Sequence, residues 1–360
     1  MCENIGVRSL AAAGSHANLN DERVEHMPTG KTGMEVYKDS VVIDGLNVSN
    51  WGSPAVYQSL HHGGVSAINA TIAIFEKYGE AMDRISTWLR ILRERADTLI
   101  QVNTPQDILD AKNSGKTGVI FGWQNASPIE NDLDRLDVFY QLGVRIIQLT
   151  YNERNLLGNG CWERTDDGLS KFGVDAIREM NRLGILIDLS HVGDRTTLEA
   201  IERSEQPVAC THANARSFVE HVRNKTDDAL KLLTEKDGVV GANAFPPFLR
   251  NGFQSTLSDY VDAIDDLVER VGIDHVGIGT DYTQEQPKEF LDHIMSYQGT
   301  RFNERRLGYP DTVVHPEGME TPDTLSNVAA GLLARGYSHE DIAKILGGNW
   351  LRLLRQVWRE

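Results

Sequence analysis

The chain contains eight short apolar segments, and each ends on a polar residue that can take part in chemistry. They occupy residues 41–47, 65–69, 118–124, 144–151, 185–191, 207–212, 238–243 and 275–281. Amphipathic stretches separate most of them, as expected for parallel strands joined by crossover helices. Eight such units predict an α/β fold, a closed (β/α)8 TIM barrel with its active site at the carboxyl ends of the strands. The candidate site is therefore the set of strand-end residues: Asn47, Asn69, Gln124, Tyr151, His191, His212, Asn243 and Asp281.

The order of these segments favours one barrel with extensions over two ordinary domains. Residues 1–33 are rich in Gly, Asn and charge without a clear period, so we expect an N-terminal arm, and residues 34–360 form the single barrel. The C-terminal helical extension covers 321–358, and the Gly- and Pro-rich stretch 282–322 is expected over the barrel mouth. Helical periodicity predicts connecting helices at 74–98, 107–114, 132–142, 172–183, 194–203, 227–236 and 257–271.

The charge balance excludes two classes of partner. A net charge of −16 would repel nucleic acid and anionic membrane, so a small molecule is the expected partner. The three cysteines form no spaced framework, which indicates a reducing compartment. No segment approaches the length of a membrane span, and the N-terminus has no continuous apolar signal. We therefore expect a cytoplasmic protein.

The two histidines at strand ends are the sharpest chemical signal. His191 and His212 end neighbouring strands, which brings two imidazoles close enough to share a divalent metal, usually zinc. A core histidine bonded to backbone is the simpler role for either one alone, but two on adjacent strand ends favour a metal or catalysis. Asp281 ends the last strand, where a carboxylate can accept a proton from water or act as a third ligand.

Two residues in loops extend this candidate site. Arg223 follows the sixth strand, and its guanidinium can clamp a substrate carboxylate, although an ion pair with Asp227 or Asp228 is the commoner role for such an arginine. Cys161 lies in the loop after Tyr151, and its thiolate could be a third zinc ligand or a nucleophile. A loop cysteine without chemistry remains the simpler interpretation.

Several long motifs have a wider significance: Asp188-Leu-Ser-His191, Thr211-His212, Arg223-Asn-Lys-Thr-Asp-Asp228, Val276-Gly-Ile-Gly-Thr-Asp281 and Ile345-Leu-Gly-Gly-Asn-Trp350. Through these motifs the chain resembles the membrane (renal) dipeptidase family of zinc metallopeptidases, from about residue 36 to the end. The resemblance implies a (β/α)8 barrel. By this resemblance His191 and His212 match the two histidines of one zinc in a binuclear pair. Asp281 matches the aspartate near the nucleophilic water, and Arg223 the arginine that binds the dipeptide carboxylate.

The chain departs from the family pattern at the other half of the site. The first-strand histidine and aspartate that hold the second zinc fall at Leu46 and Val48, which cannot coordinate a metal. The bridging glutamate falls at Gln124, a neutral amide, and the histidine that steadies the substrate carbonyl falls at Tyr151. A phenol can still donate a hydrogen bond to a developing oxyanion. We therefore predict at most one zinc per chain, on His191 and His212.

These observations support a metal-dependent hydrolase that cleaves an amide, peptide or related C–N bond in a small, polar, carboxylate-bearing molecule. Asp281, Tyr151 and Gln124 are the predicted catalytic residues. Two alternatives remain open, namely a metal-free acid–base or cysteine enzyme on the same barrel and a non-catalytic binding protein. Family members are commonly homodimers, so the expectation is a homodimer or a higher homo-oligomer. The predicted substrate-binding residues are Arg223, Asn47, Asn152 and Asn243.

Overall fold

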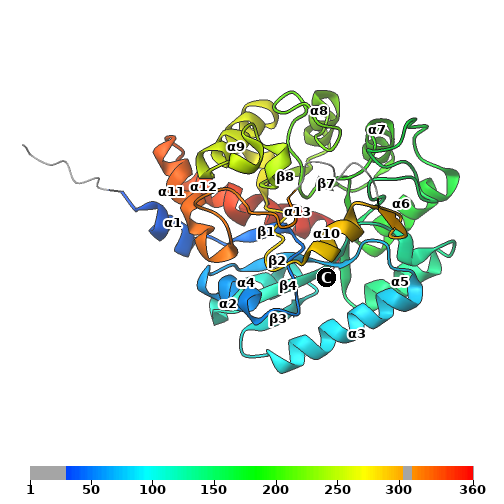
Figure 1. The fold of residues 1–360 in the computed structure, drawn as a ribbon, viewed down its shortest axis with the longest axis horizontal. Helices are drawn as coiled ribbons and strands as arrows, with labels where there is room; N and C mark the ends of the chain where they lie inside the picture. Colours follow the sequence, from blue (N-terminus) through cyan, green and yellow to red (C-terminus); the bar gives the residue numbers. More distant parts are fainter. Residues whose placement is uncertain (1–29, 303–309, 360) are drawn as a thin grey trace, which may run out of the picture. The chain divides into compact units, whose positions relative to one another are not determined.

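The computed structural model describes residues 30–302 and 310–359, and within them eight parallel strands close a barrel (Figure 1). The ring closes because β2 pairs with β4 as well as with β1. The predicted barrel is thus confirmed, with each of the eight expected strands present. They are β1 (Ile43–Asn47), β2 (Ala67–Ala73), β4 (Thr117–Trp123), β5 (Val144–Gln148), β6 (Leu186–Asp188), β7 (Ala209–Cys210), β8 (Val239–Asn243) and β9 (Val276–Gly279).

Three strands were not predicted, namely one beside the barrel and the two of a short hairpin at residues 296–302. β3 (Leu99–Val102) pairs only with the first half of β4, at Thr117–Ile120, and is not one of the eight strands of the ring. The expected helix over 74–98 is shorter in the structure, where α3 spans Tyr78–Glu94. The Glu76 carboxylate accepts hydrogen bonds from the backbone N–H groups of Ile74 and Phe75, which holds the chain in a turn before the helix. The apolar spacing that is typical of a helix therefore also includes residues 74–77, which precede the start of α3.

The other predicted connecting helices are confirmed with small shifts at their ends. Side-chain caps and left-handed glycines fix these ends, as in α6, which Ser170 caps at its start and Gly184 ends with φ 81°. The helices are α1 (Gly33–Asp39), α2 (Pro54–His62), α4 (Pro105–Ser114), α5 (Asp134–Gln141), α6 (Lys171–Leu183), α7 (Asp194–Arg203), α8 (Asp227–Glu235), α9 (Leu257–Val271), α10 (Lys288–Ile294), α11 (Ser326–Ala334), α12 (His339–Ala343) and α13 (Asn349–Val357).

The C-terminal helix α13 closes the end of the barrel where the strands begin. Trp350 is buried, and its indole N–H donates to the carbonyl of Ile278 in β9 at 2.9 Å. A Cβ added at Gly45, Gly241 or Gly277 would lie within 3.0 Å of the indole ring, so these strand glycines make room for it. The last helical piece is therefore part of the barrel core.

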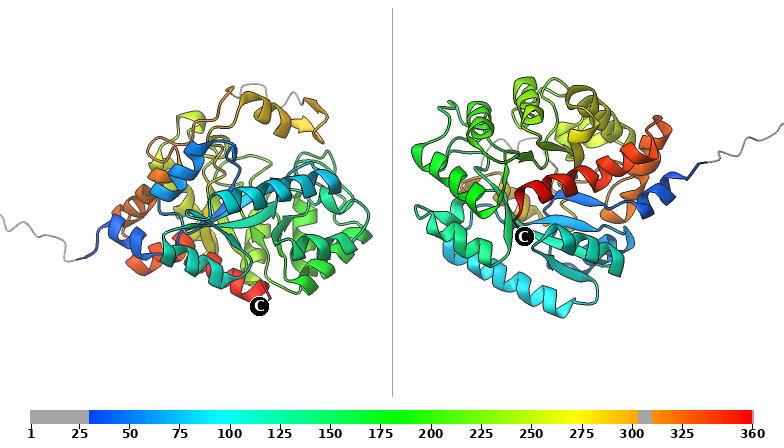
Figure 2. Two further views of the ribbon diagram at one scale, coloured as in Figure 1. Left: turned by 90° about the horizontal axis from the view of Figure 1, so that it is seen from below. Right: turned by 180° about the vertical axis from the view of Figure 1, so that it is seen from behind.

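Helix α10 lies at the opposite end of the barrel from α13 (Figure 2, left). It belongs to the long stretch after β9, which continues into a small hairpin of β10 (Ser296–Tyr297) and β11 (Arg301–Phe302). Leu291 and Ile294 of α10 form a separate apolar cluster with Val48, Ile74 and Tyr151 from the strand ends. The part of this stretch that contains α10 thus lies over the barrel mouth, as predicted.

Parts of two predicted segments fall outside the described residues. These are 1–29 in the N-terminal arm and 303–309 in the stretch over the mouth. Among the residues that the structure describes, no helix has the length and apolarity that crossing a bilayer requires.

Candidate functional site

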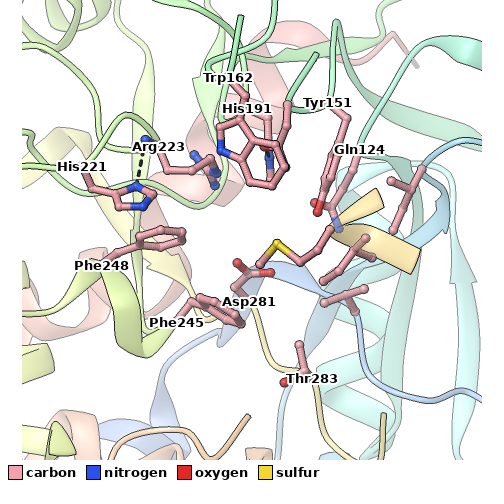
Figure 3. Close-up of a pocket in the computed structure, with 15 residues that line it drawn as sticks. Gln124, Tyr151, Trp162, His191, His221, Arg223, Phe245, Phe248, Asp281 and Thr283 are labelled. Atoms are coloured by element: carbon pink, nitrogen blue, oxygen red, sulfur yellow. Dashed lines mark hydrogen bonds between the residues drawn. The ribbon is translucent and has the colours of Figure 1, made fainter. Parts of the chain in front are cut away.

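A small cavity, here named the mouth cavity, lies at the carboxyl ends of the strands and has a volume of about 40 Å³ (Figure 3). Six of the residues predicted from the sequence line it: Gln124, Tyr151, Asn152, His191, Arg223 and Asp281. Its other walls are largely apolar and come from Val48, Ile74, Trp162, Phe245, Phe248, Ile294 and Met295. The sequence reasoning missed this apolar half. The pair Phe245 and Phe248, directly after the eighth predicted strand, was the available signal.

The two histidines face each other at this site. The Nε2 atoms of His191 and His212 are 3.0 Å apart, and both side chains are buried. His191 lines the mouth cavity, whereas His212 lies behind it with no exposed surface. Residue pairing across β6 and β7 produces this approach, because each histidine follows the end of its strand. The predicted juxtaposition is confirmed.

The hydrogen-bond partners of each ring determine its tautomer. The Asn152 Oδ1 atom lies 2.6 Å from His191 Nδ1, and a carbonyl oxygen only accepts, so this nitrogen carries the proton. Thr211 Oγ1 donates to the Asp188 carboxylate at 2.6 Å. It must therefore accept from His212 Nδ1, which lies 2.8 Å away. Both Nε2 atoms are then unprotonated, with lone pairs directed toward each other.

Asp188 anchors this arrangement, and the sequence analysis did not assign it a role. The carboxylate accepts hydrogen bonds from the backbone N–H and the hydroxyl of both Ser190 and Thr211, at 2.6 to 3.0 Å. Burial raises the pKa of Asp188, and the four donated hydrogen bonds oppose that rise. Its position three residues before His191 in the Asp-Leu-Ser-His motif could have indicated this role.

Two lone pairs at this distance repel unless a cation or a proton lies between them. Burial, with a further contribution from the Arg223 charge, lowers the pKa of both His191 and His212 well below 6.5. A proton is therefore unfavourable near neutral pH, and a metal cation satisfies both nitrogens. The donor set fits one metal held by two imidazoles.

No third protein ligand of the usual kind completes this set. In residues 30–302 and 310–359, no group of three His, Cys, Asp or Glu side chains is placed to hold a metal ion. The suggestion that Asp281 or Cys161 is the third ligand is thus not supported. Cys161 does not line the mouth cavity; its thiol contacts Asn152 Oδ1 at 3.6 Å. The remaining positions around a metal would belong to water or substrate.

The residues that would hold a second metal do not fit one. Leu46 and Val48 are buried aliphatic side chains, and Val48 packs in the apolar cluster under α10. Gln124 lines the mouth cavity, but its amide nitrogen donates to Thr71 Oγ1 at 2.9 Å. An amide held in this way brings no negative charge to offset a second dication.

Asp281 has a strained backbone conformation and a buried carboxyl group. Its φ of 59° lies in the left-handed region, which a non-glycine residue adopts at some cost, and such strain concentrates at active sites. Burial raises the pKa of the carboxyl to about 6, while Arg223 and a hydrogen bond from Asn243 oppose the rise. The Asn243 Nδ2 atom is 3.4 Å from the carboxylate. The group is therefore mostly ionised at pH 7 and able to accept a proton.

Arg223 brings a buried positive charge to the cavity. One guanidinium nitrogen donates to the Ser190 carbonyl and the other to the His212 carbonyl at 3.0 Å. Its Nε has no hydrogen-bond partner in the described residues, and the side chain forms no ion pair there with Asp227 or Asp228. Because the side chain is 3% exposed and lines the cavity, its charge faces the space where an anion could bind.

Tyr151 covers one imidazole. Its ring stacks on His191 with centroids 4.1 Å apart and an interplanar angle of 22°. Burial, and then the charge of Asp281, raises the pKa of the Tyr151 phenol, so the hydroxyl keeps its proton at neutral pH. The hydroxyl can therefore donate a hydrogen bond within the cavity.

Two predicted substrate-binding residues lie elsewhere. Asn47 does not line the mouth cavity; its amide donates to Asp44 at 3.3 Å and accepts from the Ser49 N–H at 3.1 Å. Asn243 is also fully buried, and its amide bridges the His212 carbonyl and Asp281. Neither asparagine is thus among the residues that line the mouth cavity, and their predicted contact with substrate stays a prediction.

Comparison with known proteins identifies a family that the sequence matches. Residues 43–299 and 290–359 match the membrane dipeptidase family, peptidase family M19. The chain is 30% identical to dipeptidase tcpJ of Claviceps purpurea over 77% of its own length and 60% of the relative's. It is 34% identical to an uncharacterized dipeptidase of Schizosaccharomyces pombe over 56% of its own length. The chain thus spans only 60% and 50% of the lengths of these two relatives.

A solved structure resembles the chain more fully. The crystal structure of an amidohydrolase from Pseudomonas aeruginosa is 39% identical to it and superposes with a TM-score of 0.88. The match covers 92% of this chain and 100% of the other. The fold is therefore shared over most of the chain.

Proposed function

Because the chain belongs to the membrane dipeptidase family of hydrolases, we propose that it cleaves an amide, peptide or related C–N bond in a small carboxylate-bearing molecule, with one metal per chain. The observation that carries the proposal is the pair of unprotonated Nε2 atoms of His191 and His212 beside the mouth cavity. A histidine that binds a metal through Nε2 typically donates its Nδ1–H to an acceptor, as both of these buried, neutral imidazoles do.

The metal would be held by His191 and His212, and zinc is the ion that such ligands most often take. A bound metal of this kind acts as a Lewis acid and lowers the pKa of water. Leu46, Val48 and Gln124 occupy the other positions, and these three side chains offer no ligands for a second ion. One zinc per chain is therefore part of the proposal.

The side chains around the cavity account for the remaining chemistry. Arg223 binds the substrate carboxylate, because its buried charge has no carboxylate partner in an ion pair within the described residues. Asp281 accepts the proton of the attacking water, since its pKa of about 6 leaves it ionised at neutral pH. Tyr151 donates its hydroxyl hydrogen to the oxyanion that develops on the attacked carbonyl group.

The proposal also covers the location and the assembly of the protein. The cysteine usage and the net charge of −16 support a cytoplasmic protein whose partner is a small molecule. We propose a homodimer because members of the family are commonly homodimers.

Elemental analysis of protein purified without added metal tests the central claim. We expect one zinc per chain, no second ion, and a loss of the zinc in His191→Ala. His62→Ala is the matched control, because His62 is exposed at the end of α2 and should leave the metal content unchanged. A panel of dipeptides and N-acyl amino acids, each compared with its carboxamide, then tests the substrate class.

We expect hydrolysis of free-carboxylate substrates, its loss on chelation, and its recovery with zinc. The carboxamides should react slowly, and Arg223→Gln should remove the difference between the two series. Activity that survives complete chelation would show that the metal-dependent mechanism is wrong. Equal rates for acids and carboxamides would refute the role of Arg223.

A further inference from the structure

A second and much larger cavity lies beside the mouth cavity. This side cavity has a volume of about 550 Å³ and lies between α3 and the loop that follows β1. Its volume is within the range of about 300–1,000 Å³ that is common for small-molecule sites. Val48 and Ile74 line both cavities and form the wall between them. Figure 1 shows α3 beside the strands, with α10 nearby.

Aromatic rings form one wall of the side cavity. Trp51 and Trp88 line it, with ring centroids 5.0 Å apart and a tilt of 58° between the planes. Tyr57 lies next to them, and its hydroxyl donates to the Trp51 carbonyl at 2.5 Å. The phenol is therefore already bonded, and what these side chains offer to a ligand is aromatic surface. Such a surface favours a flat apolar group.

The cavity also holds more positive than negative charge. Three arginines and two glutamates line it, and two of the arginines are paired: Arg84 with Glu76 at 3.3 Å and Arg90 with Glu94 at 2.9 Å. Arg95 has no carboxylate partner within the described residues. Its guanidinium carbon instead lies 4.1 Å from the centroid of the Tyr57 ring. A half-buried arginine fixed on an aromatic face can still bind an anion with its edge.

The side cavity is also in contact with the helix over the mouth. Phe290 of α10 lines the side cavity, while Ile294 and Met295, one turn later, line the mouth cavity. Ile74 and Phe290 belong to the same apolar packing around this helix. A molecule in the side cavity would therefore touch the helix that covers the catalytic residues.

We propose that the side cavity is a second binding site, which takes a small planar aromatic molecule with one carboxylate group. The ring packs against the surface of Trp51 and Trp88, and the carboxylate binds the Arg95 guanidinium. This assignment follows from the aromatic wall and from Arg95, the cavity arginine that has no carboxylate partner in the described residues. It does not depend on metal or turnover.

Binding of 1-naphthoate to the metal-free protein tests the proposal, with quenching of tryptophan fluorescence and calorimetry as readouts. We expect one saturable site per chain and at least about 10-fold weaker binding of the neutral isostere 1-naphthamide, because a hydrogen bond to a charged group is lost. Arg95→Gln should weaken 1-naphthoate binding by a similar factor and leave 1-naphthamide unaffected. Arg93→Gln is the matched control, since Arg93 is exposed on α3 and does not line the cavity.

Arg223→Gln identifies the cavity that is occupied. It removes the anion-binding side chain of the mouth cavity, so 1-naphthoate binding should be unchanged. Loss of binding in Arg223→Gln, with normal binding in Arg95→Gln, would place the probe in the mouth cavity and overturn the proposal. Equal affinities for 1-naphthoate and 1-naphthamide in the parent protein, or no saturation by about 1 mM, would also overturn it. The comparison of the two probes needs no variant, so a folding defect cannot mask the result.

Discussion

Replacement of Thr211 by valine should weaken metal binding without touching a metal ligand. In the structure Thr211 Oγ1 accepts from His212 Nδ1 at 2.8 Å and donates to Asp188 at 2.6 Å. Valine keeps the shape and removes the acceptor. His212 can then move its proton to Nε2 and donate to His191 Nε2, which lies 3.0 Å away. The metal would have to displace that proton.

The expected loss of zinc affinity follows from the hydrogen bond that His212 Nδ1 loses when Thr211 is replaced. Removal of a partner that orients a metal-binding histidine typically weakens affinity by about 10–100-fold, or about 1.4–2.7 kcal/mol. Buried Asp188 also loses one of four donors, which costs about 1–3 kcal/mol of folding free energy. The variant should therefore bind zinc about 10–100-fold more weakly than the parent protein. It should also unfold at a lower temperature.

Competition with a fluorescent zinc chelator at neutral pH measures the affinity, and thermal unfolding of the metal-free protein measures the stability. Thr117→Val is the matched control. Thr117 is equally buried, and its hydroxyl donates to the Val65 carbonyl at 3.0 Å, at the first residue of β4. It should lose stability but keep the zinc affinity. The tautomer argument is refuted if Thr211→Val binds zinc as tightly as the parent protein.

Three further predictions concern catalysis and packing. Tyr151→Phe should lower kcat by about 10²-fold with little change in KM, and an unchanged kcat in steady-state assays would exclude the oxyanion role. The value of kcat/KM should fall as the pH decreases through about 6, because protonation of Asp281 removes the base; a flat profile across that range contradicts this. Gly279→Ala should destabilise the barrel by about 3 kcal/mol or more in denaturant titrations, since its Cβ would lie 1.9 Å from the Thr211 carbonyl oxygen; unaltered stability would show that β9 can shift.

The strand ends were predictable because strand and helix periodicity is a local property. Every predicted barrel strand exists, and His191, His212 and Asp281 follow the strands that were expected to present them. The boundaries of α3 and the presence of β3 were not predicted, because a short strand between two helices has little pattern of its own. Position at a strand end also could not show whether a side chain points into the cavity.

The direction of each polar group depends on partners that are far apart in the sequence. Asn47 binds Asp44, which in turn accepts from Thr280, 236 residues later, so Asn47 is held away from the mouth cavity. The side cavity also depends on segments that are far apart in the sequence. Its walls come from the loop after β1, from α3 and from α10, and only closure of the barrel brings them together.

The sequence by itself determined the barrel, the order of its strands and the residue types at its rim, because these follow from apolar periodicity and from residue identity. Tertiary structure alone decided the protonated nitrogen of each histidine, the apolar cluster under α10, and the position of Arg223 Nε, which has no hydrogen-bond partner among residues 30–302 and 310–359. Hydrogen-bond partners and burial set these properties, and both arise only when distant segments pack against one another.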